Sequence, residues 1–169
     1  LIPMGAARLR IASFPVIGRG GSATEWVKSS TPPIVASHCF SGDSVEAIVD
    51  GLEPKSSNDG SIPRFTWWDH KGTAEWVEWG FPKARKVSAV DIYWFDDSGK
   101  GGCRVPKSWK LFYRVGESWK PVEEVGTFGV RSDTYNKVAF KGVQAEGLRL
   151  EVQLQPNFSG GILEWKVRE

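Results

Sequence analysis

The chain has 169 residues, of which 40% are hydrophobic and 25% are charged, so it is long enough to form one domain with a core of its own. Lys and Arg number 22 and Asp and Glu number 20, and this near balance argues against the clustered basic stripe that binds nucleic acid. No run approaches the roughly 18 apolar residues of a membrane span, and two cysteines are too few for a disulfide framework or a metal cluster.

The first part of the chain is predicted to be a separate piece. LRIASFPVI at residues 9–17 has the composition of a strand, and the glycine-rich residues 18–23 are typical of a flexible connection. The two prolines at 32–33 cannot continue a strand ladder and mark a boundary. We therefore expect residues 1–30 to be the closing strand and linker of an upstream domain, and residues 31–169 to form the main domain.

The main domain is organised around residues 65–97, which hold five of the nine tryptophans and are expected to supply much of the core. Alternation at residues 76–81 and 90–94 predicts two half-buried strands joined by a basic turn at residues 83–86. Further strands are predicted at residues 34–40, 108–115, 117–125, 135–140, 148–154 and 162–168. Many short strands separated by turn signals indicate an all-β fold, an antiparallel sandwich.

The motifs of common enzyme classes are missing from the sequence. His38 and His70 have no zinc-type spacing, and there is neither a GxSxG nor a glycine-rich phosphate loop. The carboxylate pairs at residues 96–97 and 123–124 are adjacent in sequence, and neighbours on a strand point to opposite faces, so neither makes an acid/base dyad. We expect a chain without catalysis of its own.

Four predicted loops combine carboxylates, a His, an Arg, lysines and aromatic rings. They are SGDS at residues 41–44, WWDHKG at 67–72, DDSGKGGCR at 96–104 and PNFSGG at 156–161. Charged side chains hydrogen-bond vicinal hydroxyls, and a flat ring covers the apolar face of a sugar. The loop composition therefore favours a polyol ligand, bound where the loops meet at one end of the sandwich.

Several stretches together resemble the discoidin-like family, also called coagulation factor 5/8 type C, over residues 31–169. The stretches are AIVDG at 47–51, EWVEWGF at 75–81, VSAVDIYWFDD at 87–97, RVPKSWKLFYR at 104–114 and LRLEVQLQPNFSGGILEWKV at 148–167. The resemblance implies a galactose-binding-like β-sandwich jelly roll, a fold that often serves as a carbohydrate-binding module. It also implies that Trp67 is a buried core residue. Residues 53–73 and 93–109 more specifically resemble the C-terminal module of bacterial glycoside hydrolases of the β-L-arabinofuranosidase type.

The resemblance also implies one structural calcium ion. In the family, the ion lies near the loop after the AxxDG turn and takes a Glu from the last strand, and Asp50 and Glu164 match those places. Ser57, Asn58 and Asp59 would add the hard oxygen ligands that calcium prefers. The alternative for Asp50 is a turn-forming Asp-Gly, and the alternative for Glu164 is a solvated strand residue.

The resemblance places the sugar site on the loops at one end of the jelly roll. An aromatic residue before the last strand stacks on the sugar in this family, and Phe158 matches it. The other candidates are Trp68, Asp69, His70, Asp96, Asp97, Lys100 and Arg104. The alternatives are that Phe158 anchors its loop, that Arg104 forms a salt bridge to Asp96 or Asp97, and that His70 only hydrogen-bonds its own loop.

The sequence therefore predicts a module that targets an attached glycoside hydrolase to a plant or microbial glycan containing arabinose or galactose, in the periplasm or outside the cell. A structural domain that packs on its parent enzyme is the first alternative, and a domain that recognises a protein or lipid surface is the second. A pocket with an aromatic floor, ringed by Asp97, Arg104 and Phe158, would favour sugar binding. Pairing of Cys39 with Cys103 stays open.

Overall fold

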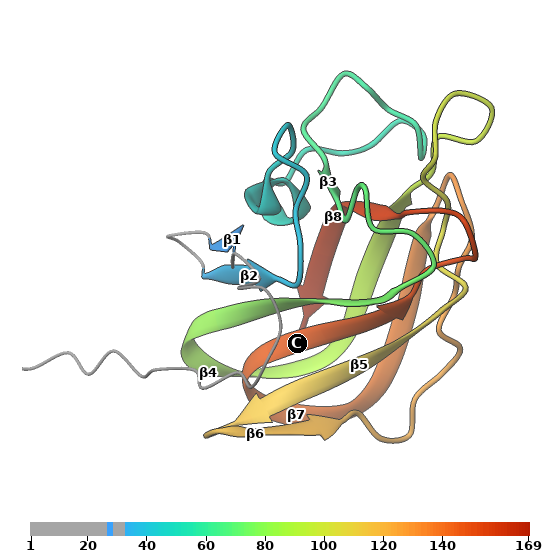
Figure 1. Cartoon of the computed structure of the whole chain (residues 1–169). Helices are drawn as coiled ribbons and strands as arrows, with labels where there is room; N and C mark the ends of the chain where they lie inside the picture. The colour runs from blue at the N-terminus through green and yellow to red at the C-terminus, as the bar shows by residue number, and fades with distance from the viewer. Residues whose placement is uncertain (1–26, 29–32) are drawn as a thin grey trace, which may run out of the picture.

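The structure, a computed structural model, describes residues 27–28 and 33–169. The predicted strand at residues 9–17 and its linker at 18–23 lie outside the described residues. The elements in chain order are β1 (Val27–Lys28), β2 (Ile34–Ala36), the short 3-10 helix η1 (Val45–Val49), β3 (Phe65–Thr66), β4 (Ala74–Phe95), β5 (Ser108–Val115), β6 (Ser118–Pro121), β7 (Tyr135–Gln153) and β8 (Gly161–Arg168). The described residues are thus almost all strand and loop (Figure 1).

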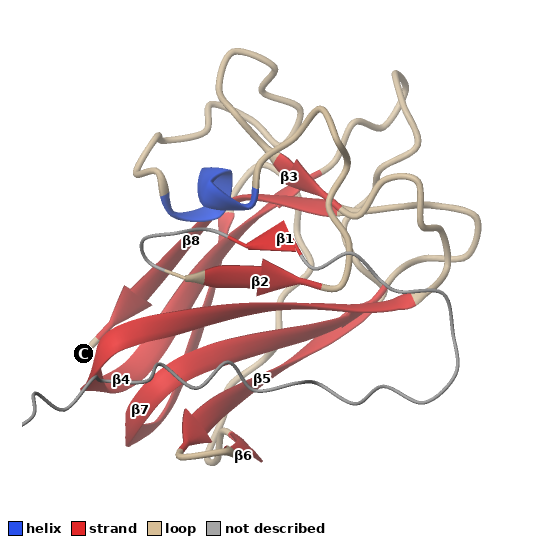
Figure 2. Ribbon diagram, turned by 60° about the vertical axis from the view of Figure 1, so that its left-hand side comes forward, coloured by secondary structure: helices blue, strands red, loops and turns tan. Residues whose placement is uncertain are grey.

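Two long bent strands, β4 and β7, carry the chain between the two layers of the sandwich (Figures 1 and 2). Residues 74–80 of β4 pair with residues 147–153 of β7, and residues 85–93 pair with residues 135–145. One layer has the strand order β1-β2-β4-β7-β5-β6, and in the other β3 pairs with β8, which pairs with the second half of β4. All pairings between strands are antiparallel, which confirms the predicted antiparallel β-sandwich.

The predicted basic turn at residues 83–86 is wrong, because these residues lie within the bend of the continuous strand β4. The two halves of β4 each pair with β7 instead of with each other. Gly80 and Gly147 face one another at the bend, and a Cβ on Gly147 would lie 2.8 Å from the carbonyl oxygen of Trp79. Two strands can therefore turn the corner together only where side chains are missing. The separate strands predicted at 135–140 and 148–154 are likewise one strand, β7.

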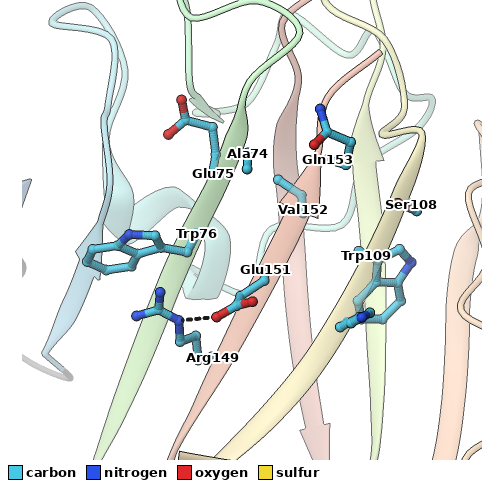
Figure 3. Close-up of a pocket in the computed structure, with 10 residues that line it drawn as sticks. Ala74, Glu75, Trp76, Ser108, Trp109, Arg149, Glu151, Val152 and Gln153 are labelled. Carbon is cyan, nitrogen blue, oxygen red and sulfur yellow. Dashed lines mark hydrogen bonds and ion pairs between the residues drawn. The ribbon is translucent and has the colours of Figure 1, made fainter.

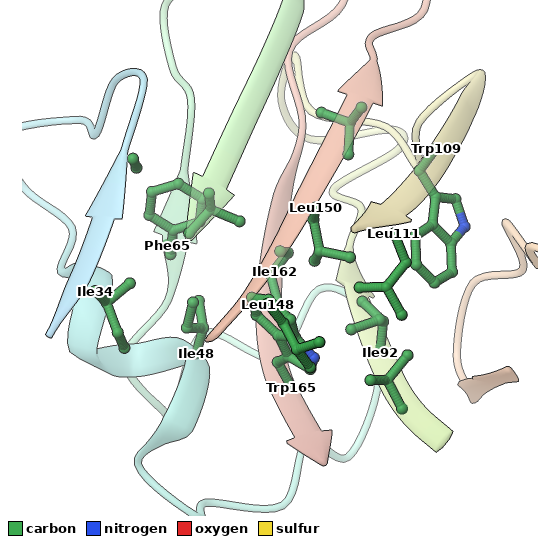
Figure 4. Packing of buried hydrophobic residues seen from close by; sticks show 14 of the residues in the cluster. Ile34, Ile48, Phe65, Ile92, Trp109, Leu111, Leu148, Leu150, Ile162 and Trp165 are labelled. Atoms are coloured by element: carbon green, nitrogen blue, oxygen red, sulfur yellow. The ribbon is translucent and has the colours of Figure 1, made fainter. Parts of the chain in front are cut away.

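The core lies between the two layers, and the side chains of Figure 4 point into it from both. Trp67, Trp94 and Trp165 are fully buried, as expected for Trp67. On β5 the predicted alternation holds, since Trp109 and Leu111 are buried while Lys110 is exposed. The predicted alternation therefore holds on β5, whereas residues 90–94 of β4, predicted to be half-buried, are buried on both faces, including Asp91 and Tyr93.

Replacing Leu148 by Ala should destabilise the fold, because Leu148 is fully buried in the core cluster. A buried Leu→Ala change costs about 2–5 kcal/mol, through lost transfer free energy and the cavity left behind. Urea unfolding would measure this loss. The matched control is Leu52→Ala, since Leu52 is 45% exposed and should change stability by less than about 0.5 kcal/mol. Equal losses in the two variants would contradict the placement of the core.

Residues 44–51 form a capped helical turn between β2 and β3. The Ser44 hydroxyl accepts a hydrogen bond from the Glu46 N–H at the start of η1. The helix ends at Asp50, and Gly51 follows with φ +77, a conformation that favours glycine. The predicted Asp-Gly turn is therefore present, but the 3-10 helix before it was not predicted.

Candidate functional site

The four loops expected to carry the site meet at one end of the sandwich, where backbone hydrogen bonds tie them together. The Gly72 N–H donates to the Phe158 carbonyl at 3.0 Å, and the Ser159 N–H donates to the Gly102 carbonyl at 2.9 Å. The Phe40 N–H, just before the first loop, donates to the Thr66 carbonyl at 3.1 Å. The loop cluster is therefore one hydrogen-bonded unit.

A hollow of about 190 Å³ opens in this loop cluster, and we call it the loop hollow. Its lining residues are Phe40, Arg64, Thr66, Trp68, Phe95, Asp97, Gly101, Gly102 and Cys103. Of the predicted site residues, Trp68 and Asp97 line it. Phe40, Arg64 and Phe95 were not predicted, although each directly adjoins a loop or strand that had been singled out.

Asp97 is fixed at the hollow by its own glycine-rich loop. One carboxylate oxygen, Oδ1, accepts a hydrogen bond from the Cys103 N–H at 2.8 Å. The Asp97 carbonyl accepts from the N–H groups of Lys100 and Gly101, both at 2.9 Å. A Cβ on Gly101 would lie 2.0 Å from Oδ2, so only glycine lets the loop close this tightly around the carboxylate. The carboxylate is thereby preorganised as an acceptor.

Trp68 forms a half-buried aromatic wall of the loop hollow. Gly102 packs so closely on the indole that an added Cβ would lie 2.5 Å from its Cζ3 atom. The Lys71 ammonium lies 4.8 Å from the ring centroid. Phe40, which is 37% exposed, and Phe95 add two more rings to the lining. The hollow therefore offers apolar surface on which a sugar ring could pack.

Arg64 supplies a positive group to the same hollow. Its Nε donates to Oδ1 of Asp43 at 3.2 Å, and its guanidinium lies 4.9 Å from the centroid of the Phe95 ring. The other oxygen of Asp43 accepts a hydrogen bond from the Thr66 hydroxyl. Asp43 therefore acts as an anchor that orients Arg64. Together, Arg64 and Asp97 place a hydrogen-bond donor and an acceptor beside aromatic rings.

Arg104 and Phe158 do not line the loop hollow, because they pack on each other. The Arg104 guanidinium lies 4.2 Å from the centroid of the Phe158 ring and donates to the carbonyls of Gly101 and Cys103. It also lies 3.6 Å from Oδ1 of Asp97. These contacts match the two alternatives of a salt bridge for Arg104 and a loop anchor for Phe158.

Three more of the predicted sugar contacts, Asp96, Asp69 and Lys100, are not lining residues of the loop hollow. Oδ1 of Asp96 accepts from the N–H and hydroxyl of Ser98, and Oδ2 accepts from the Val105 N–H at 3.0 Å, so this carboxylate stabilises its own loop. Asp69 and Lys100 are exposed and do not line the hollow.

His70 is held by a buried carboxylate. Its Nδ1 donates to Glu75, which also accepts from the hydroxyls of Ser37 and Thr73. Its ring stacks on His38 with 4.0 Å between centroids, and Nε2 of His38 donates to the Trp68 carbonyl at 2.7 Å. His70 thus hydrogen-bonds within its own region, as the alternative reading held.

The two principal residues of the predicted calcium site, Asp50 and Glu164, lie close enough to interact electrostatically. Glu164 is only 3% exposed, and its Oε2 has no hydrogen-bond partner. Burial, and then the charge of Asp50, raise the pKa of Glu164 to about 8. An orphaned buried carboxylate oxygen beside a second carboxylate fits a hard cation.

Ser57 and Asn58 are engaged elsewhere. The Ser57 hydroxyl oxygen accepts from the Asp133 N–H at 2.7 Å, and the Asn58 side-chain oxygen accepts from the Ser56 hydroxyl at 2.7 Å. The carboxylate of Asp59 accepts from the N–H groups of Lys55 and Ser61. The described residues contain no group of three or more His, Cys, Asp or Glu side chains that could hold a metal. A cation at Asp50 and Glu164 would therefore also need carbonyl or water oxygens.

Cys39 and Cys103 are both buried and both free thiols in the structure. Burial raises the pKa of each thiol to about 12, so neither is a thiolate near neutral pH.

Among the described residues, no helix is both long and apolar enough to cross a membrane.

Comparison with solved structures gives the class of fold. The chain is similar to a chain of the Streptococcus pneumoniae β-galactosidase BgaA, with a TM-score of 0.72 and 20% identity over 87% of this chain and 97% of that one. It is also similar to the family 32 carbohydrate-binding module of C. perfringens NanJ, solved with galactose, with a TM-score of 0.62 and 19% identity over 80% of this chain and 92% of that one. A third similar structure is chitosan-binding module 1 of a Paenibacillus sp. IK-5 chitosanase/glucanase, with a TM-score of 0.60 and 15% identity over 84% of this chain and 95% of that one.

The chain therefore shares its fold with these solved structures, which agrees with the β-sandwich jelly roll predicted from the sequence. No protein-family model matches the sequence.

Proposed function

We propose that this chain is a non-catalytic carbohydrate-binding module whose sugar site is the loop hollow. The observation that carries the proposal is the conjunction of Trp68 and Phe40 with Arg64 and Asp97 in one concave site. Few convergent polar groups on an apolar lining are the general form of a small-ligand site. The structures it resembles include a module solved with galactose and a module described as chitosan-binding.

The size of the hollow favours a single sugar ring. Its volume of about 190 Å³ lies below the roughly 300–1,000 Å³ of pockets that enclose drug-sized ligands. A hydroxyl pair could donate to Asp97 and accept from Arg64 while the apolar face of the ring packs on Trp68. A ligand this small makes few contacts, so we expect modest affinity.

The attached partner and the ligand class follow from the same proposal. We expect the module to target a glycoside hydrolase in the same protein to its glycan. Binding of the glycan would raise the effective concentration of substrate around the hydrolase. The glycan would be of plant or microbial origin and contain arabinose or galactose, and the protein would work in the periplasm or outside the cell. These assignments rest on the sequence resemblance described above.

A calcium ion bound at Asp50 and Glu164 is part of the proposal. It would neutralise the buried Glu164 carboxylate and tie the Asp50-Gly51 turn to β8. Its role would be structural, because Asp50 and Glu164 do not line the loop hollow.

The rival function is a structural domain that packs on its parent enzyme without a ligand. Such a domain needs complementary flush surfaces and not a concave site. The pocket expected at Asp97, Arg104 and Phe158 is instead lined by Asp97 with Phe40 and Trp68, and a concave site with this aromatic lining favours binding over packing.

A glycan array probed with the chain, with calcium and with chelator, tests the proposal. We expect hits among arabinans, galactans or pectic glycans that bind with micromolar to millimolar affinity in calorimetry. Arg64→Ala should weaken a hit about tenfold, the effect of losing one charged hydrogen bond. The control Arg131→Ala, at an exposed site away from the hollow, should leave it unchanged. The absence of any hit across plant, microbial and host glycans would favour the structural domain.

A further inference from the structure

The outward face of the layer with the strand order β1-β2-β4-β7-β5-β6 carries a second hollow, which we call the sheet hollow. It has a volume of about 330 Å³, lies across β4, β7 and β5, and shares no lining residue with the loop hollow. Figure 3 shows Trp76 and Arg149 on one side of it, Glu151 in the middle and Ser108 on the other side. Its walls are strand residues and not loop residues, so their positions are set by the sheet.

The cross-strand register explains why the face is hollowed there. Ala74, Gln153 and Ser108 lie in one row across the three strands, with small side chains at both ends of the row. Trp76, Glu151 and Lys110 form the next row. Residues in register on neighbouring strands share a face, so a row flanked by small side chains lies beside a row of large ones. The difference in side-chain size between the two rows, which hollows the face, is therefore fixed by the strand pairing.

The polar groups of the sheet hollow are held in place. One guanidinium nitrogen of Arg149 donates to Glu78 at 2.5 Å, and its Nε donates to Oε1 of Glu151 at 3.0 Å. The guanidinium also lies 4.5 Å from the ring centroid of Trp76. Side chains that are already ordered lose little freedom when a ligand arrives, which favours binding. Arg149 therefore orders both the acidic and the aromatic parts of the hollow.

The chemistry of the lining matches an uncharged polyol. Glu151 has 45% of its side chain exposed and can accept from hydroxyl groups. Lys110 is exposed in the register position opposite Glu151 and can donate. The positive charges of Lys110 and Arg149 are opposed by Glu75 and Glu151 in the lining and by Glu78, which pairs with Arg149, so the hollow does not favour an anion. The Trp76 side chain adds apolar surface to the wall.

We propose that the sheet hollow is a second saccharide subsite, which takes a neutral sugar residue within a glycan chain while the loop hollow takes another. The inference rests on the proposed function, because it assumes that the chain binds glycans. A site across the face of a sheet suits a residue inside a chain. Two linked subsites raise the overall affinity for long glycans above that for single sugars.

Amide chemical-shift titration of the ¹⁵N-labelled chain tests this, with galactose, arabinose, β-1,4-galactotetraose and α-1,5-arabinopentaose as probes. We expect an oligosaccharide to shift amides in residues 74–76, 108–110 and 149–153 as well as in the loop cluster, and its monosaccharide to shift the loop cluster alone. Glu151→Ala should abolish the sheet shifts and lower oligosaccharide affinity about tenfold, with monosaccharide affinity unchanged.

Lys110→Ala gives a second, independent arm, because Lys110 is exposed and its loss should not disturb the ion pairs of Arg149. Its matched control is Lys137→Ala. Lys137 is exposed on β7, lies opposite Asp91 in the strand register, and is not a lining residue of the sheet hollow. Shifts confined to the loop cluster, with unchanged affinity in Glu151→Ala and Lys110→Ala, would overturn the second subsite and leave the proposed function standing. No shift with any probe would overturn both.

Discussion

Trp68→Ala should reduce glycan affinity by about thirtyfold or more, the largest effect we expect at the loop hollow. An aromatic side chain at the centre of a binding site typically accounts for about 2 kcal/mol or more when it is truncated, and this corresponds to about thirtyfold in Kd. The indole of Trp68 lines the hollow and is packed against Gly102, so it is rigid before the ligand binds. Isothermal titration calorimetry with the best array hit would measure the loss.

Two further variants keep this result interpretable. Trp119→Ala removes a half-buried tryptophan from the β5–β6 hairpin, outside the loop hollow, and should leave affinity unchanged. Phe40→Ala removes an exposed ring from the hollow, where loss of folding is a smaller concern, and should also weaken binding. Wild-type affinity in both Trp68→Ala and Phe40→Ala would place the sugar site elsewhere on the molecule.

The strands could be predicted from the sequence because alternation is a local property. Val77 and Trp94 occupy inward positions that their neighbours predict, and Trp109 and Leu111 do the same on β5. The bend of β4 could not be predicted in this way. It depends on pairing between Gly80 and Gly147, which are far apart in sequence, and a basic stretch such as residues 83–86 is equally typical of a turn.

The loops of the candidate site could be predicted, but their inward-facing side chains could not. Asp96 and Asp97 are adjacent, yet Asp96 accepts from Val105 and Ser98 while Asp97 lines the hollow. Both carboxylates stabilise the same loop, and only the folded backbone decides which one is also presented to a ligand. Arg64 was missed for a similar reason, since its orientation depends on Asp43 in another loop.

Glu164→Gln should make the chain more stable in chelator at pH 8.5 and insensitive to calcium. The pKa of Glu164 is about 8 in the folded protein against an ordinary 4.5, so folding favours the protonated form. The stability contributed by this group is fully present below pH 4.5 and is lost as the pH rises through about 8. A neutral Gln avoids the buried charge, and we expect a gain of about 1–3 kcal/mol over wild type at pH 8.5.

Calcium should offset this gain. A cation that binds the ionised Glu164 and Asp50 stabilises only the wild type, by about 2.7 kcal/mol at a hundredfold excess over Kd. Urea unfolding of both proteins from pH 5 to 9, with chelator and with calcium, measures both effects, and the exposed Glu117→Gln serves as control. A difference between wild type and Glu164→Gln that does not change with pH in chelator would contradict the raised pKa. If the pH dependence is present but calcium stabilises neither protein, the buried carboxylate is a proton site and the structural calcium ion is excluded.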